Sequence, residues 1–322
     1  MAETTASPGD IQVTASSVPD NVTWVKPRIN PFTRDWVLFI LFMFPNMFFL
    51  TLFTFWPAIK NIRMSFQRIS LLNSSTKWVG LDNYRYIFEH PTFQQVLRNT
   101  LYFTVGTLLG TLVLGLAIAL LLNQKLRFRN GARAIIFAPY LLSGAAIGIV
   151  WSYIFDPRYG LLAQVLGWVN IGSPDWLNRP EWAMPAIIIV YVWKNVGFAA
   201  TIFLAGLQAI PKDLYEAAKL DGANVWWRFR SVTLPMLSPI SFFLLVTTVL
   251  GTFQAFDIQR VMTKGGPAYS TTTLVYYVYE QGFGQAANYG RAAAAALTLF
   301  AAMLVITIIQ FRASRNQVHY DG

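Results

Sequence analysis

The sequence contains no cysteine among its 322 residues. It therefore cannot form a disulfide, bind a metal through thiolates or use a thiol as a nucleophile. It also lacks a G-x-x-x-x-G-K-[ST] phosphate-binding loop and an H-E-x-x-H zinc motif. Its two histidines, His90 and His319, lie far apart. These absences predict no cofactor and no metal centre in this chain, and they argue against the common designs for ATP binding and metal-dependent hydrolysis.

Charged side chains are scarce as well. They make up 12% of the residues, whereas a typical soluble domain has about 25%. Apolar residues make up 55% of the sequence and gather in long runs, each close to the ~20 residues that a bilayer-spanning helix needs. We therefore predict an all-α polytopic membrane protein. Six transmembrane helices are expected, at about residues 36–59, 100–122, 134–155, 182–207, 239–256 and 291–311.

The net charge of +10 favours lipid headgroups rather than nucleic acid as the partner. Basic residues flank the apolar runs, and no basic stripe interleaved with aromatic residues stands outside them. Residues 1–34 are rich in Ser, Thr, Pro and Asp, so we expect a disordered tail and no signal peptide. The segment 123–133 has four basic and no acidic residues, which predicts a cytoplasmic loop. With six spans, the tail at 1–34 and the tail at 316–322 would then both be cytoplasmic.

A hydrophilic stretch, residues 208–238, separates the fourth and fifth runs. Pro211 suits the first turn of a helix, and residues 213–220 are good helix formers. Gly222 can supply a left-handed stop, and Asn224 can cap a second short helix over 225–232. We therefore expect these two short helices to form a compact knob outside the membrane.

The knob is followed by two proline signals. Leu234-Pro235 is expected to end the second helix, and Ser238-Pro239 to provide the cap and first-turn proline of the fifth span. The small side chains of Ala217, Ala218 and Ala223 would let the surface of another protein approach closely.

The spacing of Glu216-Ala217-Ala218, Gly222 and Leu234-Pro235 resembles the EAA loop of ABC-importer permeases. Val232 stands where isoleucine is commoner in that family. Gly265-Gly266-Pro267 before the last run is a second match in the same order, and Gly80-Leu81-Asp82-Asn83-Tyr84 is a third. Asp82 is expected to cap a short surface helix that ends near Phe88. The resemblance implies a type I ABC-importer permease fold, with a six-helix permease domain at 35–315.

The resemblance also implies partners and a location. They are two copies of an ABC ATPase that hold the ATP and Mg²⁺, a second homologous permease subunit and an extracytoplasmic solute-binding protein, in a bacterial inner membrane. The membrane subunit docks on its ATPase through the EAA loop. The implied coupling residues are Glu216, Ala217, Ala218, Asp221 and Gly222.

Lys194 lies about midway along the fourth predicted span, where an ionisable side chain is costly and a candidate for function. Tyr191, Asn195 and Phe198 share its helix face. This strip could stack on a sugar and donate hydrogen bonds to hydroxyl or phosphate groups. Alternatively, Lys194 could reach towards the membrane surface or pair with a carboxylate.

The fifth span offers four more candidates for the solute pathway. Their alternative role is hydrogen bonding between helices, which is common in membrane bundles. The four residues are Thr248, Thr252, Gln254 and Asp257.

The run 238–246 and the ending Gln310-Phe311-Arg312 are similar to permeases for glycerol 3-phosphate and glycerophosphodiesters. A neutral di- or oligosaccharide of the trehalose or maltose type is the alternative substrate. A secondary transporter is a more remote alternative, because it would need buried carboxylates for ion coupling, and the spans contain almost none. A membrane enzyme is disfavoured, since no acid–base or nucleophile constellation is present. We expect a transport subunit without enzymatic activity of its own.

Overall fold

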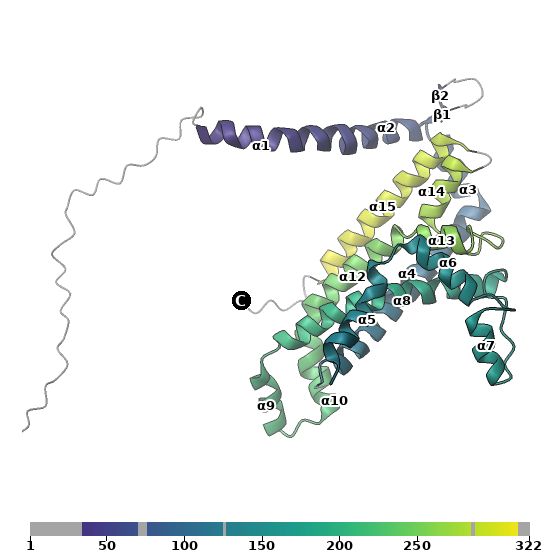
Figure 1. Cartoon of the computed structure of the whole chain (residues 1–322). Helices are drawn as coiled ribbons and strands as arrows, with labels where there is room; N and C mark the ends of the chain where they lie inside the picture. Colours follow the sequence, from purple (N-terminus) through teal and green to yellow (C-terminus); the bar gives the residue numbers. More distant parts are fainter. Residues whose placement is uncertain (1–33, 70–75, 125–126, 285–286, 315–322) are drawn as a thin grey trace, which may run out of the picture. The chain divides into compact units, whose positions relative to one another are not determined.

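The computed structural model describes residues 34–69, 76–124, 127–284 and 287–314 (Figure 1). Apart from Arg34, the predicted tails at 1–34 and 316–322 lie outside these ranges. The chain divides into two units, residues 1–57 and 58–322. The structure is helical almost throughout, which confirms the predicted fold class.

The first unit contains α1 (Arg34–Leu50), which continues as a π-helical turn, η1 (Thr51–Phe55). With α2 (Trp56–Ser65) these turns form an unbroken helical run that is long and apolar enough to cross a membrane. The first predicted span is thus confirmed. None of the side chains described in α1 or η1 is buried. Because the exposed side chains are mainly Phe, Leu and Met, this run needs lipid or another chain around it.

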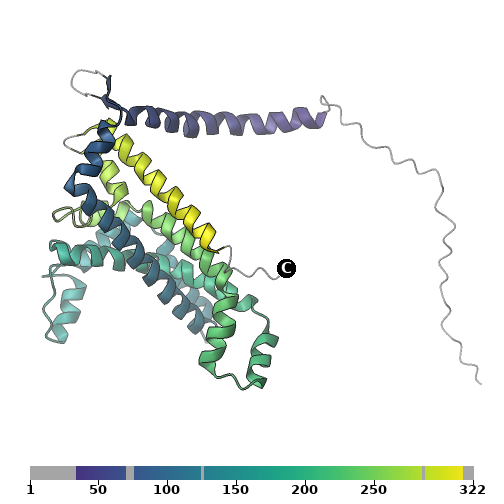
Figure 2. The same ribbon diagram turned by 180° about the vertical axis from the view of Figure 1, so that it is seen from behind.

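In the second unit, α4 (Pro91–Leu122) and α8 (Pro180–Ala209) pack against each other along much of their length. Three glycines of α4 make the close approach possible. A Cβ atom on Gly110, for example, would lie 2.7 Å from Val192 of α8, and one on Gly115 would lie 2.8 Å from the Cβ of Ala199. Helices α12 (Ser238–Phe253) and α15 (Tyr289–Ser314) complete the long apolar helices of this unit (Figure 2).

The third predicted span, 134–155, is two helices rather than one. The chain bends by 102° between helix α5 (Arg129–Leu141) and helix α6 (Gly144–Ile154). Pro139 weakens the last turn of α5, and Leu142 is extended, with φ −79° and ψ 149°. Among the described residues, five helices are therefore long and apolar enough to span a membrane, or six if this bent pair is one span.

Several short elements were not predicted. Strands β1 (Gln67–Ile69) and β2 (Thr76–Trp78) pair antiparallel. Three short helices connect the longer helices along the sequence: α7 (Leu161–Trp168), α13 (Asp257–Met262) and α14 (Leu274–Phe283). The expected surface helix is present as α3 (Asp82–Glu89), but Asp82 does not cap it. Asp82 is its first residue, and the N-cap position is held by Leu81, whose side chain makes no hydrogen bond.

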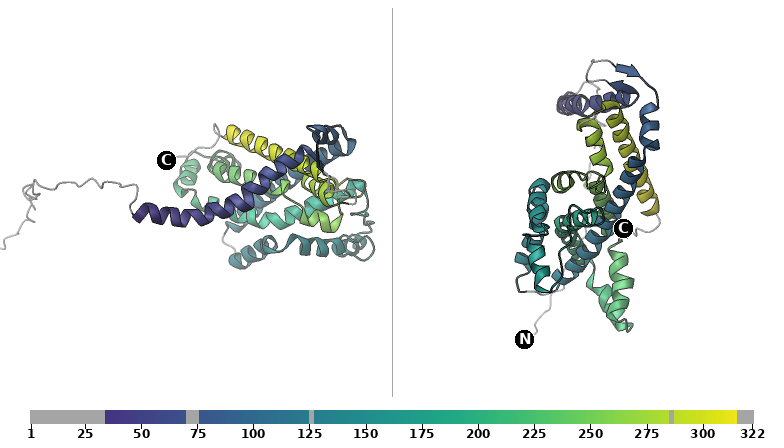
Figure 3. Two further views of the ribbon diagram at one scale, coloured as in Figure 1. Left: turned by 90° about the horizontal axis from the view of Figure 1, so that it is seen from above. Right: turned by 90° about the vertical axis from the view of Figure 1, so that its right-hand side faces the viewer.

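The predicted knob is also present, at residues 211–236. It comprises α9 (Lys212–Leu220), α10 (Val225–Arg228), a π-helical turn η2 (Phe229–Thr233) and α11 (Leu234–Met236). It lies at one end of the second unit, and α3 and α14 lie at the opposite end, which we call the far end (Figures 1 and 3).

Three details of the expectations for the knob were wrong, whereas Pro239 lies in the first turn of α12 as predicted. Pro211 occupies the N-cap position of α9 rather than its first turn. Pro235 does not end the helix, because it sits at the start of α11, where its missing N–H is tolerated. Ser238 is the first residue of α12 and not its cap.

Candidate functional site

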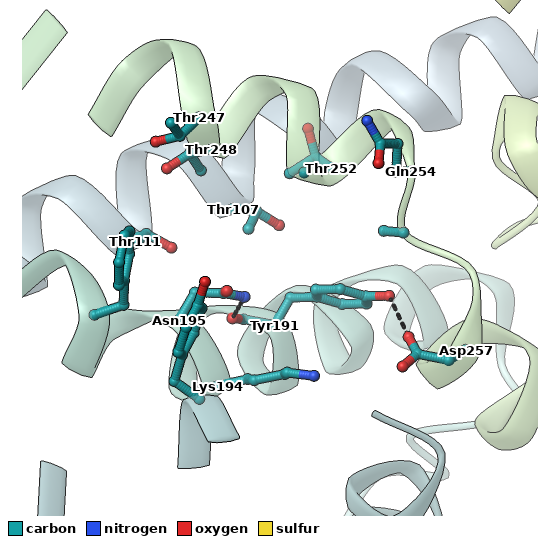
Figure 4. A pocket seen from close by; sticks show the side chains of 14 residues that line it. Thr107, Thr111, Tyr191, Lys194, Asn195, Thr247, Thr248, Thr252, Gln254 and Asp257 are labelled. Atoms are coloured by element: carbon teal, nitrogen blue, oxygen red, sulfur yellow. Dashed lines mark hydrogen bonds between the residues drawn. The ribbon is translucent and has the colours of Figure 1, made fainter. Parts of the chain in front are cut away.

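A cavity of about 560 Å³ lies within the second unit, between α4, α5, α8 and α12 and the segment that joins α12 to α13 (Figure 4). Lys194, near the middle of α8, is one of its lining residues. The structure brings all eight predicted pathway residues to this one cavity. They are Tyr191, Lys194, Asn195, Phe198, Thr248, Thr252, Gln254 and Asp257.

The Lys194 side chain is half-buried and has no charge partner in the described part of the chain. No carboxylate there lies within 4.0 Å of its ammonium group, so the alternative of an ion pair is not realised. The adjacent Asn195 amide nitrogen donates to the Tyr191 carbonyl at 2.7 Å. That hydrogen bond holds the Asn195 side chain along the helix. Lys194 therefore lines the cavity without an ion-pair partner in the described structure, although the Asp257 carboxylate lines the same cavity.

Aromatic rings form one part of the same wall. Phe198 stacks on Tyr140 of α5, with ring centroids 4.7 Å apart and ring planes at 14°. Tyr191 packs edge-on against Phe103 of α4, with centroids 4.9 Å apart. Flat, apolar surfaces of this kind suit the carbon face of a sugar or glycerol unit.

Asp257 lines the cavity at the first residue of α13. Its Oδ1 atom accepts hydrogen bonds from the Tyr191 hydroxyl at 3.3 Å and from the Ile258 backbone N–H at 2.9 Å. Its carboxylate also packs directly against Gly144, at the start of α6, where a Cβ atom would collide with it. The carboxylate is thus near the N-terminus of α6, where helix polarity favours a negative charge. Asp257 joins three helices in addition to lining the cavity.

The predicted threonines of the fifth span differ in their partners. Thr252 is buried, and its hydroxyl donates to the Val249 carbonyl at 2.7 Å and lies 3.1 Å from the Thr104 hydroxyl of α4. The alternative of helix-to-helix hydrogen bonding therefore holds for Thr252. Thr248 and Gln254 line the cavity without any such bond in the described structure.

Sequence reasoning missed six lining residues. Thr107 and Thr111 could have been found, because they continue a threonine pattern on the second span. Tyr140 could not, since its position depends on the break between α5 and α6. The six residues are Thr107, Thr111, Tyr140, Thr247, Gly251 and Ala255.

Two local features predicted for the knob, the left-handed turn at Gly222 and the cap at Asn224, are confirmed. Gly222 has φ +79°, the left-handed conformation that favours glycine. The Asn224 side chain accepts a hydrogen bond from the Trp227 N–H at 2.8 Å and so caps α10. Around this turn, Leu220 is 88% and Val225 75% exposed.

Four of the five predicted coupling residues are exposed on the knob: Glu216, Ala217, Asp221 and Gly222. The fifth, Ala218, is buried, and the coupling role of all five residues stays a prediction. Ala218 follows Tyr215 by three residues and shares its side of α9. The Tyr215 hydroxyl lies 3.0 Å from the Thr233 hydroxyl of η2, so this side of α9 faces the rest of the knob.

Known proteins resemble this chain over most of its length. The family described as "binding-protein-dependent transport system inner membrane component" matches residues 111–317. The sulfoquinovosyl glycerol transport system permease of Agrobacterium fabrum is 34% identical, over 88% of this chain and 92% of the relative. The sn-glycerol-3-phosphate transport system permease of Brucella abortus is 35% identical, over 86% of this chain and 94% of the relative.

A solved structure is similar too. It is that of a bacterial ABC transporter involved in the import of the acidic polysaccharide alginate. The TM-score is 0.77 at 26% sequence identity, and the match covers 89% of this chain and 97% of that one.

These comparisons define a subunit of a membrane transport system. More particularly, the chain belongs to the binding-protein-dependent transport system inner membrane components, the multi-pass permeases of ABC importers. This assignment confirms the type I permease fold inferred from the EAA spacing.

Proposed function

We propose that this permease carries a glycerol 3-phosphate- or glycerophosphodiester-type solute across the bacterial inner membrane through the cavity between α4, α8 and α12. The observation that carries the proposal is the Lys194 ammonium group, which lines the cavity without a carboxylate partner among the described residues. Two of the relatives are named for glycerol-containing solutes, and the similar solved transporter imports an acidic polysaccharide. An anionic polyol fits both the charge and these names.

The electrostatic argument favours an anion over a neutral solute. Two unit charges 4 Å apart attract by about 4 kcal/mol at an effective dielectric constant of ~20. A phosphate beside Lys194 would supply the ion pair that Lys194 lacks in the described structure. A neutral sugar would leave the ammonium group partly desolvated and unpaired, which is unfavourable.

The test compares Lys194→Met with wild type in cells that express the permease with its native partner subunits. Labelled glycerol 3-phosphate uptake should show a KM at least about tenfold higher in the variant, since losing part of a ~4 kcal/mol attraction exceeds the ~1.4 kcal/mol that equals a factor of ten. Lys77→Met, on the exposed β2 strand, is the matched control and should leave uptake unchanged. An unchanged KM in Lys194→Met would contradict the proposal.

A neutral di- or oligosaccharide of the trehalose or maltose type is the second candidate. The stacked Tyr140–Phe198 pair favours it, because aromatic faces bind sugars without needing charge. Wild-type uptake of labelled maltose or trehalose that exceeds glycerol 3-phosphate uptake, and that survives Lys194→Met, would select this candidate.

We further propose that the exposed knob residues Glu216, Ala217, Asp221 and Gly222 dock on an ABC ATPase, two copies of which hold and hydrolyse ATP with Mg²⁺. A second homologous permease subunit would complete the pathway. A periplasmic solute-binding protein would deliver the solute at the far end, and a similar solved transporter is in complex with such a protein. In this arrangement the knob and both termini are cytoplasmic.

Affinity purification from native membranes separates this arrangement from a self-sufficient secondary transporter. An ATPase and a second permease should co-purify with the chain. Recovery of the chain alone, with retained transport, would favour the secondary transporter.

A further inference from the structure

Four threonines follow one another along α4 at spacings of four, three and four residues, which place them on one helix face. All four side chains are at least 94% buried. They divide into two pairs with different surroundings. The four are Thr100, Thr104, Thr107 and Thr111.

The first pair has structural partners. The Thr100 hydroxyl donates to the Val96 carbonyl at 2.7 Å and accepts from the Leu274 backbone N–H at 2.9 Å, so it joins α4 to α14. Thr104 lies 3.1 Å from the Thr252 hydroxyl and joins α4 to α12. These two threonines hold helices together.

The second pair has no such partners. Thr107 and Thr111 are each 1% exposed and line the cavity, and neither hydroxyl has a hydrogen-bond partner in the described structure. Other threonines of this bundle satisfy their hydroxyls within their own helix. Thr201 donates to the Gly197 carbonyl at 2.8 Å, and Thr298 to the Ala294 carbonyl at 2.9 Å. A buried hydroxyl without a partner is unfavourable, so a group that pairs with Thr107 and Thr111 would be bound.

Their position shows what kind of group that is. Thr107 and Thr111 form a wall of the cavity separate from α8, which carries Lys194 and Tyr191 (Figure 4). Side chains four residues apart on a helix have Cβ atoms about 5–6 Å apart, within reach of neighbouring hydroxyl groups on one small solute. Each threonine hydroxyl can both donate and accept a hydrogen bond, as can the hydroxyl groups of a polyol.

We propose that Thr107 and Thr111 are specificity-determining residues that hydrogen-bond the hydroxyl groups of the transported solute. The cavity then has two sides, with Lys194 binding the anionic end and the α4 threonines binding the glycerol or sugar end. The assignment of the two ends rests on the proposed function. The role of the threonines also applies to a neutral sugar, which carries hydroxyls alone.

The test uses Thr107→Val and Thr111→Val, which keep the side-chain shape and remove the hydroxyl, in cells that express the complete transporter. With glycerol 3-phosphate as the labelled solute, each change should raise the KM about 2- to 10-fold, the effect of one neutral hydrogen bond, with little change in Vmax. Thr201→Val is the matched control and should leave the KM unchanged, because its hydroxyl serves only its own helix. Thr107→Ser keeps the hydroxyl and should retain wild-type KM even if a valine variant fails to reach the membrane.

A solute that lacks one hydroxyl separates binding from a purely structural role of the two threonines. A structural role would not change how strongly the transporter discriminates between that solute and glycerol 3-phosphate. Wild type should transport 3-hydroxypropyl phosphate, which lacks the second hydroxyl of glycerol 3-phosphate, with a higher KM than glycerol 3-phosphate. The Thr107→Val/Thr111→Val double variant should discriminate less between the two. Equal discrimination by wild type and double variant, or valine variants with unchanged KM, would overturn the inference.

The two proposals fail in different ways. Uptake of maltose in place of glycerol 3-phosphate, with a KM that rises in the valine variants, would overturn the anionic substrate and support the threonine role. Uptake of glycerol 3-phosphate with a KM that depends on Lys194 but not on the threonines would do the reverse. Absence of uptake of either solute by wild type would overturn both.

Discussion

Gly144→Ala probes the contact that holds Asp257 at the break between α5 and α6. A Cβ atom on residue 144 would occupy the space of the Asp257 carboxylate. The carboxylate would have to move away from the Tyr191 hydroxyl and the Ile258 N–H, which donate to its Oδ1 atom at 3.3 and 2.9 Å.

The expected loss follows from these two hydrogen bonds. Each hydrogen bond to a charged group contributes about 1.5–3 kcal/mol, and water in the cavity can replace part of it. We expect Gly144→Ala to lower the free energy of unfolding by about 2–4 kcal/mol. Replacing glycine by alanine in a helix otherwise stabilises by roughly 0.5–1 kcal/mol. Gly131→Ala, in α5, is the matched control, since a Cβ atom there meets nothing within 4 Å.

Thermal unfolding of the purified protein in detergent, followed by the fluorescence of its 11 tryptophans, measures the effect. Each kcal/mol should change the Tm by about 2–4 °C for a domain of 150–250 residues. A double-mutant cycle completes the test, because Gly144→Ala should cost little once Asp257→Ala has removed the carboxylate. Equal Tm values for Gly144→Ala and Gly131→Ala would refute the reasoning.

Two further predictions concern the knob and the far end. Glu216→Lys or Gly222→Pro should abolish uptake while leaving the amount of protein in the membrane unchanged, because proline cannot adopt the φ of +79° at position 222. Wild-type uptake in both variants, with membrane levels checked by immunoblot, would exclude a coupling role. Burial raises the pKa of the Glu280 carboxyl in α14 above its usual range. The protonated carboxyl therefore stabilises the fold fully below the unfolded pKa of about 4.3, and this contribution is lost as the pH rises through the higher folded pKa. As the pH rises from 4 to 8, the Tm of the wild type should therefore fall relative to the Tm of Glu280→Gln. A difference between the two Tm values that stays constant from pH 4 to 8 would contradict this.

Much of the site could be predicted from the sequence, because it depends on one continuous helix. The spacing of Tyr191, Lys194, Asn195 and Phe198 fixes a shared face as soon as α8 is recognised as a helix. The turn at Gly222 was equally predictable, since its conformation is set by local chemistry. Whether these residues act on a solute or an ATPase stays a prediction.

What could not be predicted depends on contacts between distant segments. The 102° break after Leu141 leaves Tyr140 facing Phe198, and the contact between Gly144 and Asp257 joins positions more than 100 residues apart. Apolar composition alone predicted one span there, at about residues 134–155. The burial of Ala218 was likewise not predictable, because it depends on the packing of α9 against η2.

The joint between α8 and the knob has a mechanical consequence. Only Ile210 and Pro211 separate α8 from α9, and α8 has 30 residues, a length of about 45 Å at 1.5 Å per residue. Because this link is short, we expect a displacement of α9 to be transmitted to α8, the helix that bears the Lys194 ammonium group. Under the proposed function, a rotation of α8 would then move the Lys194 ammonium group relative to the anionic solute and weaken the attraction between them.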